Sequence, residues 1–268
     1  MLKLNNVTLV MIDSLDDYCD KSNIRMATMS RILPKILEEV EFSDILSINP
    51  FNKNKDLIDK KIEQKVWNRN VAEINNINWY CEFVVSKLPY MIKTDYYLIM
   101  QWDGFIINKN NWSNKFFEYD YIGGGHTLLN GGFSLRKTET MRRIVESGNP
   151  QIISNTGVSH EDELYSSYFD FPAEFQKTKH NVPFHMEWPD ETILNKFCSF
   201  MEVTNSFGWH RSVDLSIMYS IKKYKDFGIF SELELNKLKN YFLLKETHGI
   251  EYDIKNYSMD YNESFFNY

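Results

Sequence analysis

Asp103 is the residue whose type and position most favour chemistry. It follows the apolar run Tyr96–Gln101 and precedes Gly104. An acid placed directly after a buried strand lies at the carboxyl edge of a sheet, where open α/β sheets bind ligands. Mg²⁺ and Mn²⁺ prefer carboxylate oxygen and keep waters or substrate phosphates as their other ligands. A strand-end aspartate that simply opens a turn is the plainer alternative.

A second candidate is the glycine pair Gly131-Gly132 in the segment NGGFSLR, residues 130–136. Paired glycines that enter a strand allow a ligand to approach bare backbone. The Asn130-Gly131 step is also a common hairpin turn, so the segment has a structural explanation as well. Arg136 fits two interpretations, a phosphate contact or a surface salt bridge.

A third candidate is the acidic run Glu161-Asp162-Glu163, which follows His160. Adjacent carboxylates repel one another unless they are exposed or functional. A general base for a sugar hydroxyl needs a carboxylate within hydrogen-bond reach. Acids at the first turn of a helix are also stabilised by the helix dipole, and both roles are compatible.

The last candidate is the segment Phe207–His210, in which a histidine follows glycine and tryptophan. A lone histidine is more often a structural hydrogen-bonding group than a ligand. Trp102 and Trp209 neighbour candidate ligands and are the tryptophans best placed to stack on a sugar, although core packing is the usual role of tryptophan.

Alternating strand and helix patterns must position these residues. Strands are predicted at Val7–Ile12, 45–48, 96–101, 121–122 and 131–136, and helices at 26–40, 78–88, 112–119, 137–145 and from 161 onwards. Residues 52–70 are lysine-rich and are expected at the surface, and two amphipathic helices are expected at 213–224 and 231–242. This alternation predicts an α/β fold with a mostly parallel sheet covered on both faces.

The composition excludes several classes of protein. The chain has 268 residues, a formal net charge of -7 and 43% hydrophobic residues, as expected of a packed α/β protein. The acidic balance argues against broad nucleic-acid binding. Its three cysteines form no CxxC pair and fit a reducing cytoplasm. The longest apolar run near the N-terminus is too short to span a membrane, so a cytoplasmic protein, bacterial or viral in a host cell, is expected.

The segment from Trp79 to His210 resembles the GT-A glycosyltransferases, and in particular a group of them found in bacteria and viruses. The resemblance covers about half of the chain. It is carried in order by WYCEF at 79–83, QWDGF at 101–105, YDYIG at 119–123, NGGFSLR at 130–136, the Glu-Asp pair at 161–162 and FGWH at 207–210. It implies a GT-A, Rossmann-like sheet flanked by helices.

The resemblance also implies a metal site. GT-A enzymes commonly hold Mn²⁺ or Mg²⁺ with a DxD motif, and Gln101-Trp102-Asp103 occupies that place. Only the second acid of the motif remains, as Asp103. A late histidine completes the metal site in many members, and His210 matches it.

The resemblance further implies a base and a donor site. The xED motif of the family matches His160-Glu161-Asp162, with Asp162 as the base of inverting members and Glu161 beside it. The loop after the first strand, with Asp13 and Ser14, is the expected nucleotide pocket. The donor-binding set then comprises Asp13, Ser14, Gln101, Trp102, Asp103, Gly131, Gly132 and Arg136.

The expected function is a hexosyl- or pentosyltransferase that moves a sugar from a nucleotide-diphosphate donor to a hydroxyl of a glycan, protein or modified base, with inversion. Residues 1–212 are the expected catalytic domain, and 213–268 a helical C-terminal extension and tail. A metal-dependent nucleotidyl- or phosphotransferase is one alternative, although no GxxxxGK[ST] motif is present. A sugar- or nucleotide-binding protein with weakened catalysis is another, favoured by the missing first acid and disfavoured by Asp162 and His210.

Overall fold

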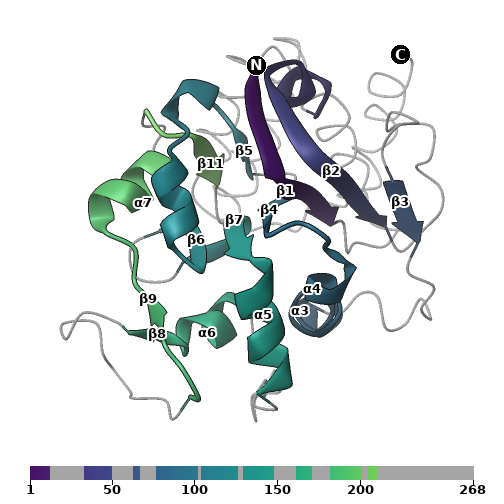
Figure 1. Ribbon diagram of the computed structural model, residues 1–268, viewed down its shortest axis with the longest axis vertical. Coiled ribbons are helices and arrows are strands. Elements are labelled where there is room, and N and C mark those ends of the chain that lie inside the picture. Colours follow the sequence, from purple (N-terminus) through teal and green to yellow (C-terminus); the bar gives the residue numbers. More distant parts are fainter. Residues whose placement is uncertain are drawn as a thin grey trace, which may run out of the picture.

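The fold is α/β, with a mixed central sheet flanked by helices. The computed structural model describes residues 1–12, 33–49, 63–66, 77–101, 104–125, 129–147, 161–170, 182–200 and 205–210. The central sheet contains β1 (Leu2–Ile12), β2 (Val40–Asn49), β3 (Glu63–Val66), β4 (Tyr96–Met100), β6 (Tyr121–Gly124) and β7 (Asn130–Lys137). Their order across the sheet is β3-β2-β1-β4-β7-β6 (Figure 1).

The sheet changes direction at β7. Strands β3, β2, β1 and β4 are parallel, whereas β7 is antiparallel to both β4 and β6. Only residues 125–129 connect β6 to β7, and so short a connection allows a hairpin but not the crossover that parallel neighbours need. The sheet is therefore mixed, parallel from β3 to β4 and antiparallel at the β7–β6 edge, and the prediction of a mostly parallel sheet is not confirmed.

Helices and short strands surround this sheet. The helices are α3 (Ile77–Ser86), α4 (Leu88–Met91), α5 (Thr138–Glu146), α6 (Glu161–Ser166) and α7 (Glu191–Phe197), with 3₁₀ turns η2 (Lys109–Asn111) and η3 (Asn114–Glu118). A second sheet has the order β10 (Cys198–Phe200), β11 (Gly208–His210), β5 (Gly104–Ile106), and β8 (Phe169–Asp170) pairs with β9 (Met186–Glu187). Helices α3, α4, α5 and α6 gather on one side of the molecule, where α3 contacts the other three (Figure 1).

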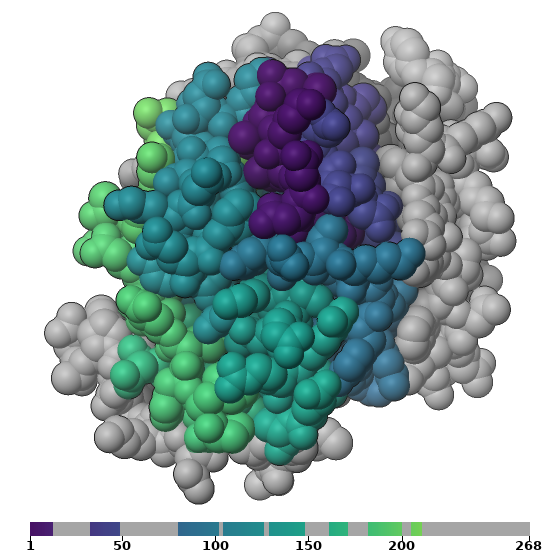
Figure 2. Space-filling model, in the orientation of Figure 1, coloured from purple at the N-terminus to yellow at the C-terminus, as the bar shows by residue number. Residues whose placement is uncertain are grey.

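Strand β4 forms the centre of the core. All five of its residues, YYLIM, are buried, as expected of a strand covered on both faces. Its neighbour β1 is buried from Val7 to Ile12 and lies beside β2 on the face seen in Figure 2. The strand that leads to the candidate site is therefore among the most completely buried parts of the fold.

The elements expected from the sequence are largely confirmed. The predicted strands and the helices at 78–88 and 137–145 are present, although β1 and β2 extend further than expected. Three differences stand out: the helix before β2 ends at residue 39, η3 replaces the helix at 112–119, and β3 lies within the segment 52–70. The helices expected at 213–224 and 231–242, and with them the proposed C-terminal extension, lie outside the described residues. Within the described part of the chain, no helix is long and apolar enough to cross a membrane.

Candidate functional site

The first part of the site is the turn that follows β4. The backbone N–H of Gln101 donates a hydrogen bond to the backbone carbonyl of Gly132 at 2.8 Å, and the backbone N–H of Gly104 donates one to the backbone carbonyl of Gln101 at 3.1 Å. The first bond continues the pairing of β4 with β7, and the second closes a turn between β4 and β5. Trp102 and Asp103 stand between Gln101 and Gly104 in the sequence and lie outside the described residues, as do Asp13, Ser14 and His160.

The late histidine lies against this turn. Strand β11 pairs antiparallel with β5, which sets His210 opposite Gly104. The His210 side chain is buried, and a Cβ atom added to Gly104 would approach its Cδ2 atom to 2.6 Å. The structure thus brings the QWDGF and FGWH segments together across more than 100 residues of sequence.

The glycine pair is where the candidate side chains converge. A Cβ atom on Gly132 would overlap His210 Nε2 and approach Gln101 Oε1 to 2.6 Å, and one on Gly131 would overlap the Glu161 carboxylate. We expected these glycines to leave room for a ligand. Protein side chains instead occupy the space that a Cβ atom on either glycine would fill, so the glycines allow the site residues to come together.

Replacing Gly132 by alanine should therefore disturb the site. The added methyl group must displace the His210 ring or the Gln101 amide, and overpacking of this kind costs about 1–3 kcal/mol of folding free energy. We expect a lower urea midpoint for Gly132→Ala, together with weaker binding of any ligand that uses His210. An unchanged midpoint would show that the neighbouring side chains move aside freely.

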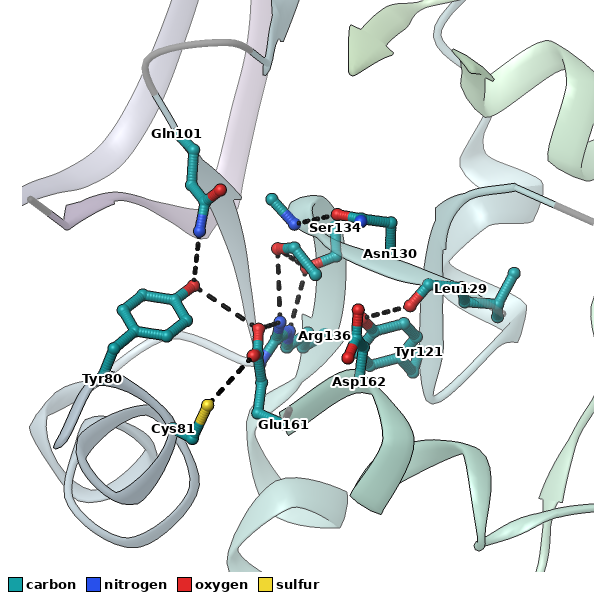
Figure 3. A network of polar contacts seen from close by, with 12 residues as sticks. Tyr80, Cys81, Gln101, Tyr121, Leu129, Asn130, Ser134, Arg136, Glu161 and Asp162 are labelled. Carbon is teal, nitrogen blue, oxygen red and sulfur yellow. Dashed lines mark hydrogen bonds and ion pairs between the residues drawn. The ribbon is translucent and has the colours of Figure 1, made fainter. Parts of the chain in front are cut away.

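Arg136 and Glu161 form a buried ion pair at the centre of Figure 3. The Arg136 Nη2 atom lies 3.3 Å from Glu161 Oε1, and the two side chains are 0% and 6% exposed. Arg136 Nε donates to Ser134 Oγ at 2.9 Å, and Nη2 also reaches the Gly131 carbonyl at 3.3 Å. The salt bridge offered as one interpretation of Arg136 is present, in the interior rather than at the surface.

Aromatic rings enclose the guanidinium. Its central carbon lies 4.9 Å from the ring centroids of both Tyr121 and Tyr165. Burial raises the pKa of both tyrosines and raises that of Tyr97 to about 12, although the nearby Arg136 opposes the shift. The tyrosines are consequently neutral at physiological pH, and the charge of Arg136 is balanced by Glu161.

The two adjacent acids differ in environment. Glu161 is buried and also accepts contacts from the Tyr80 hydroxyl at 3.5 Å and the Cys81 thiol at 3.7 Å. Asp162 is partly exposed, and its Oδ1 accepts the backbone N–H of Glu163 at 2.9 Å. Figure 3 shows Asp162 beside Tyr121 on the side of Leu129, away from Tyr80 and Cys81. The site therefore holds one carboxylate fixed inside and one near the surface.

The roles of Tyr80, Cys81 and the tyrosines around Arg136 were not predicted from the sequence. A usable signal existed, because Arg136 lies in a strand that also carries Phe133 and Leu135, and a buried arginine requires an anion. The identity of that anion could not be read from β7 alone, since Glu161 lies 25 residues further along the chain.

The described residues do not test the metal site. Among them no group of three or more His, Cys, Asp or Glu side chains is arranged to hold a metal. Of the two expected ligands, His210 is described and Asp103 is not. The nitrogen of His210 and the amide oxygen of Gln101, both beside Gly132, are donors compatible with Mn²⁺.

Three comparisons with known proteins bear on this chain. No curated protein matches it significantly in sequence. A solved structure of a glycosyltransferase involved in the glycosylation of the major capsid of PBCV-1 matches 84% of this chain over 99% of its own length, with a TM-score of 0.44 and 10% identity. A family model described as "protein of unknown function (DUF5672)" matches residues 61–210, which is more than half of the chain and includes the whole described site from Tyr80 to His210. The chain therefore belongs to the DUF5672 family.

Proposed function

We propose that this protein is a GT-A glycosyltransferase that transfers a sugar from a nucleotide-diphosphate donor to a hydroxyl acceptor with inversion. The observation that carries the proposal is that Gln101, Glu161 and His210 converge on the glycine pair of β7, beside the end of β4. These residues come from the separate sequence segments in which the chain resembles GT-A enzymes. The carboxyl end of a parallel strand is also where α/β sheets bind ligands.

In this proposal Asp162 is the general base and Glu161 is not. Glu161 is buried and its charge is engaged by Arg136, whereas Asp162 is partly exposed at the start of α6. As the acceptor oxygen attacks the anomeric carbon, its proton passes to the Asp162 carboxylate. The bond from that carbon to the nucleotide diphosphate breaks on the opposite face, which gives inversion.

The donor site is proposed at the turn after β4. His210 and Gln101 present a ring nitrogen and an amide oxygen beside Gly132, and Asp103 adjoins them in sequence. We propose that Asp103 and His210 hold Mn²⁺ or Mg²⁺. When bound, such a cation stabilises the negative charge of the departing diphosphate. His210 is buried, and the backbone of the half-buried Gln101 is anchored to Gly132, so that little reorganisation of these donors is needed during the reaction.

Titration with nucleotides tests the proposal. Calorimetry and thermal shift with UDP and GDP sugars, with and without Mn²⁺, should find one donor that binds. At 100 times its Kd, that donor should stabilise the fold by about 2.7 kcal/mol. His210→Ala should reduce the dependence of binding on Mn²⁺, whereas Lys3→Ala, on the exposed surface of β1, should not. No binding of any nucleotide sugar, with or without metal, would refute the transferase proposal.

A further inference from the structure

A short hydrogen-bond chain joins the buried acid to the turn after β4. Gln101 Nε2 donates to the Tyr80 hydroxyl at 2.8 Å, and that hydroxyl lies 3.5 Å from Glu161 Oε1 (Figure 3). Tyr80 in α3 is buried, 4% exposed, and so is Glu161, whereas Gln101 at the other end of the chain is half-buried. The three residues come from α3, the end of β4 and the start of α6.

The direction of each hydrogen bond follows from the chemistry of the groups. The Glu161 carboxylate carries a charge balanced by Arg136 and can only accept. The Tyr80 hydroxyl has a single proton, which it donates to the charged acceptor because such bonds are the stronger ones. The hydroxyl oxygen must then accept its second bond, and the Gln101 atom that faces it must be the NH₂ group.

This direction fixes the other end of the amide. With Nε2 bound to Tyr80, Gln101 Oε1 lies on the side of Gly132, where it would meet a Cβ atom at 2.6 Å, next to His210 Nε2. If the amide were flipped, Gln101 Oε1 and the Glu161 carboxylate would both need the single proton of the Tyr80 hydroxyl, and one of them would lose its hydrogen bond. The flip is therefore disfavoured by the loss of a buried hydrogen bond.

We propose that Tyr80 is a positioning residue. Because it donates its proton to Glu161, it must accept from the Gln101 NH₂ group, and this holds the Gln101 oxygen toward the donor side of the site. Gln101 stands where GT-A enzymes carry the first acid of the DxD motif. A fixed amide oxygen supplies a hydrogen-bond acceptor for donor hydroxyls or metal-bound water in place of that acid. The kinetic consequence rests on the transferase function proposed above, whereas the orientation of the amide does not.

Side-chain NMR tests the orientation without any activity. The chain has four glutamines, so ¹⁵N labelling of glutamine gives four NH₂ signals, and Gln101→Met identifies that of Gln101. We expect proton contacts between this NH₂ group and the Tyr80 ring, and exchange with water that accelerates by about three- to tenfold in Tyr80→Phe. The matched control is Tyr168→Phe, which removes the hydroxyl of another buried tyrosine, one that contacts Ser147 Oγ at 3.1 Å and none of the described site residues. Unchanged exchange in Tyr80→Phe, or equal acceleration in Tyr168→Phe, would overturn the proposed orientation.

Kinetics test the consequence once a donor is known. Tyr80→Phe and Gln101→Met should each raise the donor KM by about tenfold with little change in kcat, and the double variant should be no worse than either single one. Tyr168→Phe should leave both constants unchanged. If Tyr80→Phe unfolds, Gln101→Met must still raise the KM. Additive effects of the two substitutions on the donor KM, or a loss confined to kcat, would overturn the positioning role. A protein that binds no donor but keeps the NMR contacts would refute only the transferase function.

Discussion

The variant Glu161→Gln should lower the free energy of unfolding by about 3–5 kcal/mol, because it leaves a buried guanidinium without its anion. Glutamine preserves the shape of the side chain, so the loss reports charge rather than packing. Arg136 cannot escape by deprotonation. Its remaining acceptors, Ser134 Oγ and the Gly131 carbonyl, are neutral. Urea denaturation of the full chain measures the change.

Two further variants separate charge from structure. Arg136→Met should cost less than Glu161→Gln, since a buried carboxyl group can take up a proton and an arginine cannot release one. The double variant Arg136→Met/Glu161→Gln should recover much of the loss, because it removes both charges.

The matched control is the same substitution at an exposed pair. Lys3 Nζ lies 3.6 Å from Glu41 Oε2, with side chains 63% and 45% exposed. Glu41→Gln should change the stability by at most about 1 kcal/mol. Equal losses at Glu41 and Glu161 would contradict the role assigned to the buried pair.

The sequence predicted the framework of the site better than its interior. Runs such as YYLIM identify a strand on their own, whereas the glycine pair, expected to leave room for a ligand, instead lies against protein side chains. Apolar periodicity, however, gives no information about which acid neutralises Arg136. That partner depends on how α6 packs against β7, a contact formed by the tertiary fold. Strand β3 was not predicted because its four residues, EQKV, show no apolar pattern.

The unequal roles of Glu161 and Asp162 also follow from the fold. Successive residues of an α-helix point about 100° apart around its axis. Once Glu161 at the start of α6 faces Arg136, Asp162 must point elsewhere, and it lies beside Tyr121 in Figure 3. An acidic pair in sequence thus becomes one structural and one accessible carboxylate. This division could not be deduced from the sequence, in which either acid is a candidate catalytic residue.

Asp162→Asn should lower kcat by about 10²- to 10⁴-fold while donor binding is retained, because asparagine cannot accept the acceptor proton. The amide keeps an oxygen that can accept the Glu163 N–H, as Asp162 Oδ1 does at 2.9 Å. Loss of the charge at the helix start should cost only about 0.3–1 kcal/mol of stability. The loss of activity therefore cannot be explained by the small loss of folding free energy.

Steady-state kinetics with the donor found by titration measure this loss, and a pH profile identifies its cause. The wild-type rate should fall at low pH as the base becomes protonated, and the residual rate of Asp162→Asn should lack that fall. The control is Glu163→Gln, which neutralises the next acid of the same run at an exposed position and should leave kcat unchanged. If Asp162→Asn transferred sugar at the wild-type rate, the accessible carboxylate would not be the base. A retaining reaction without it would then become the better account of the same site.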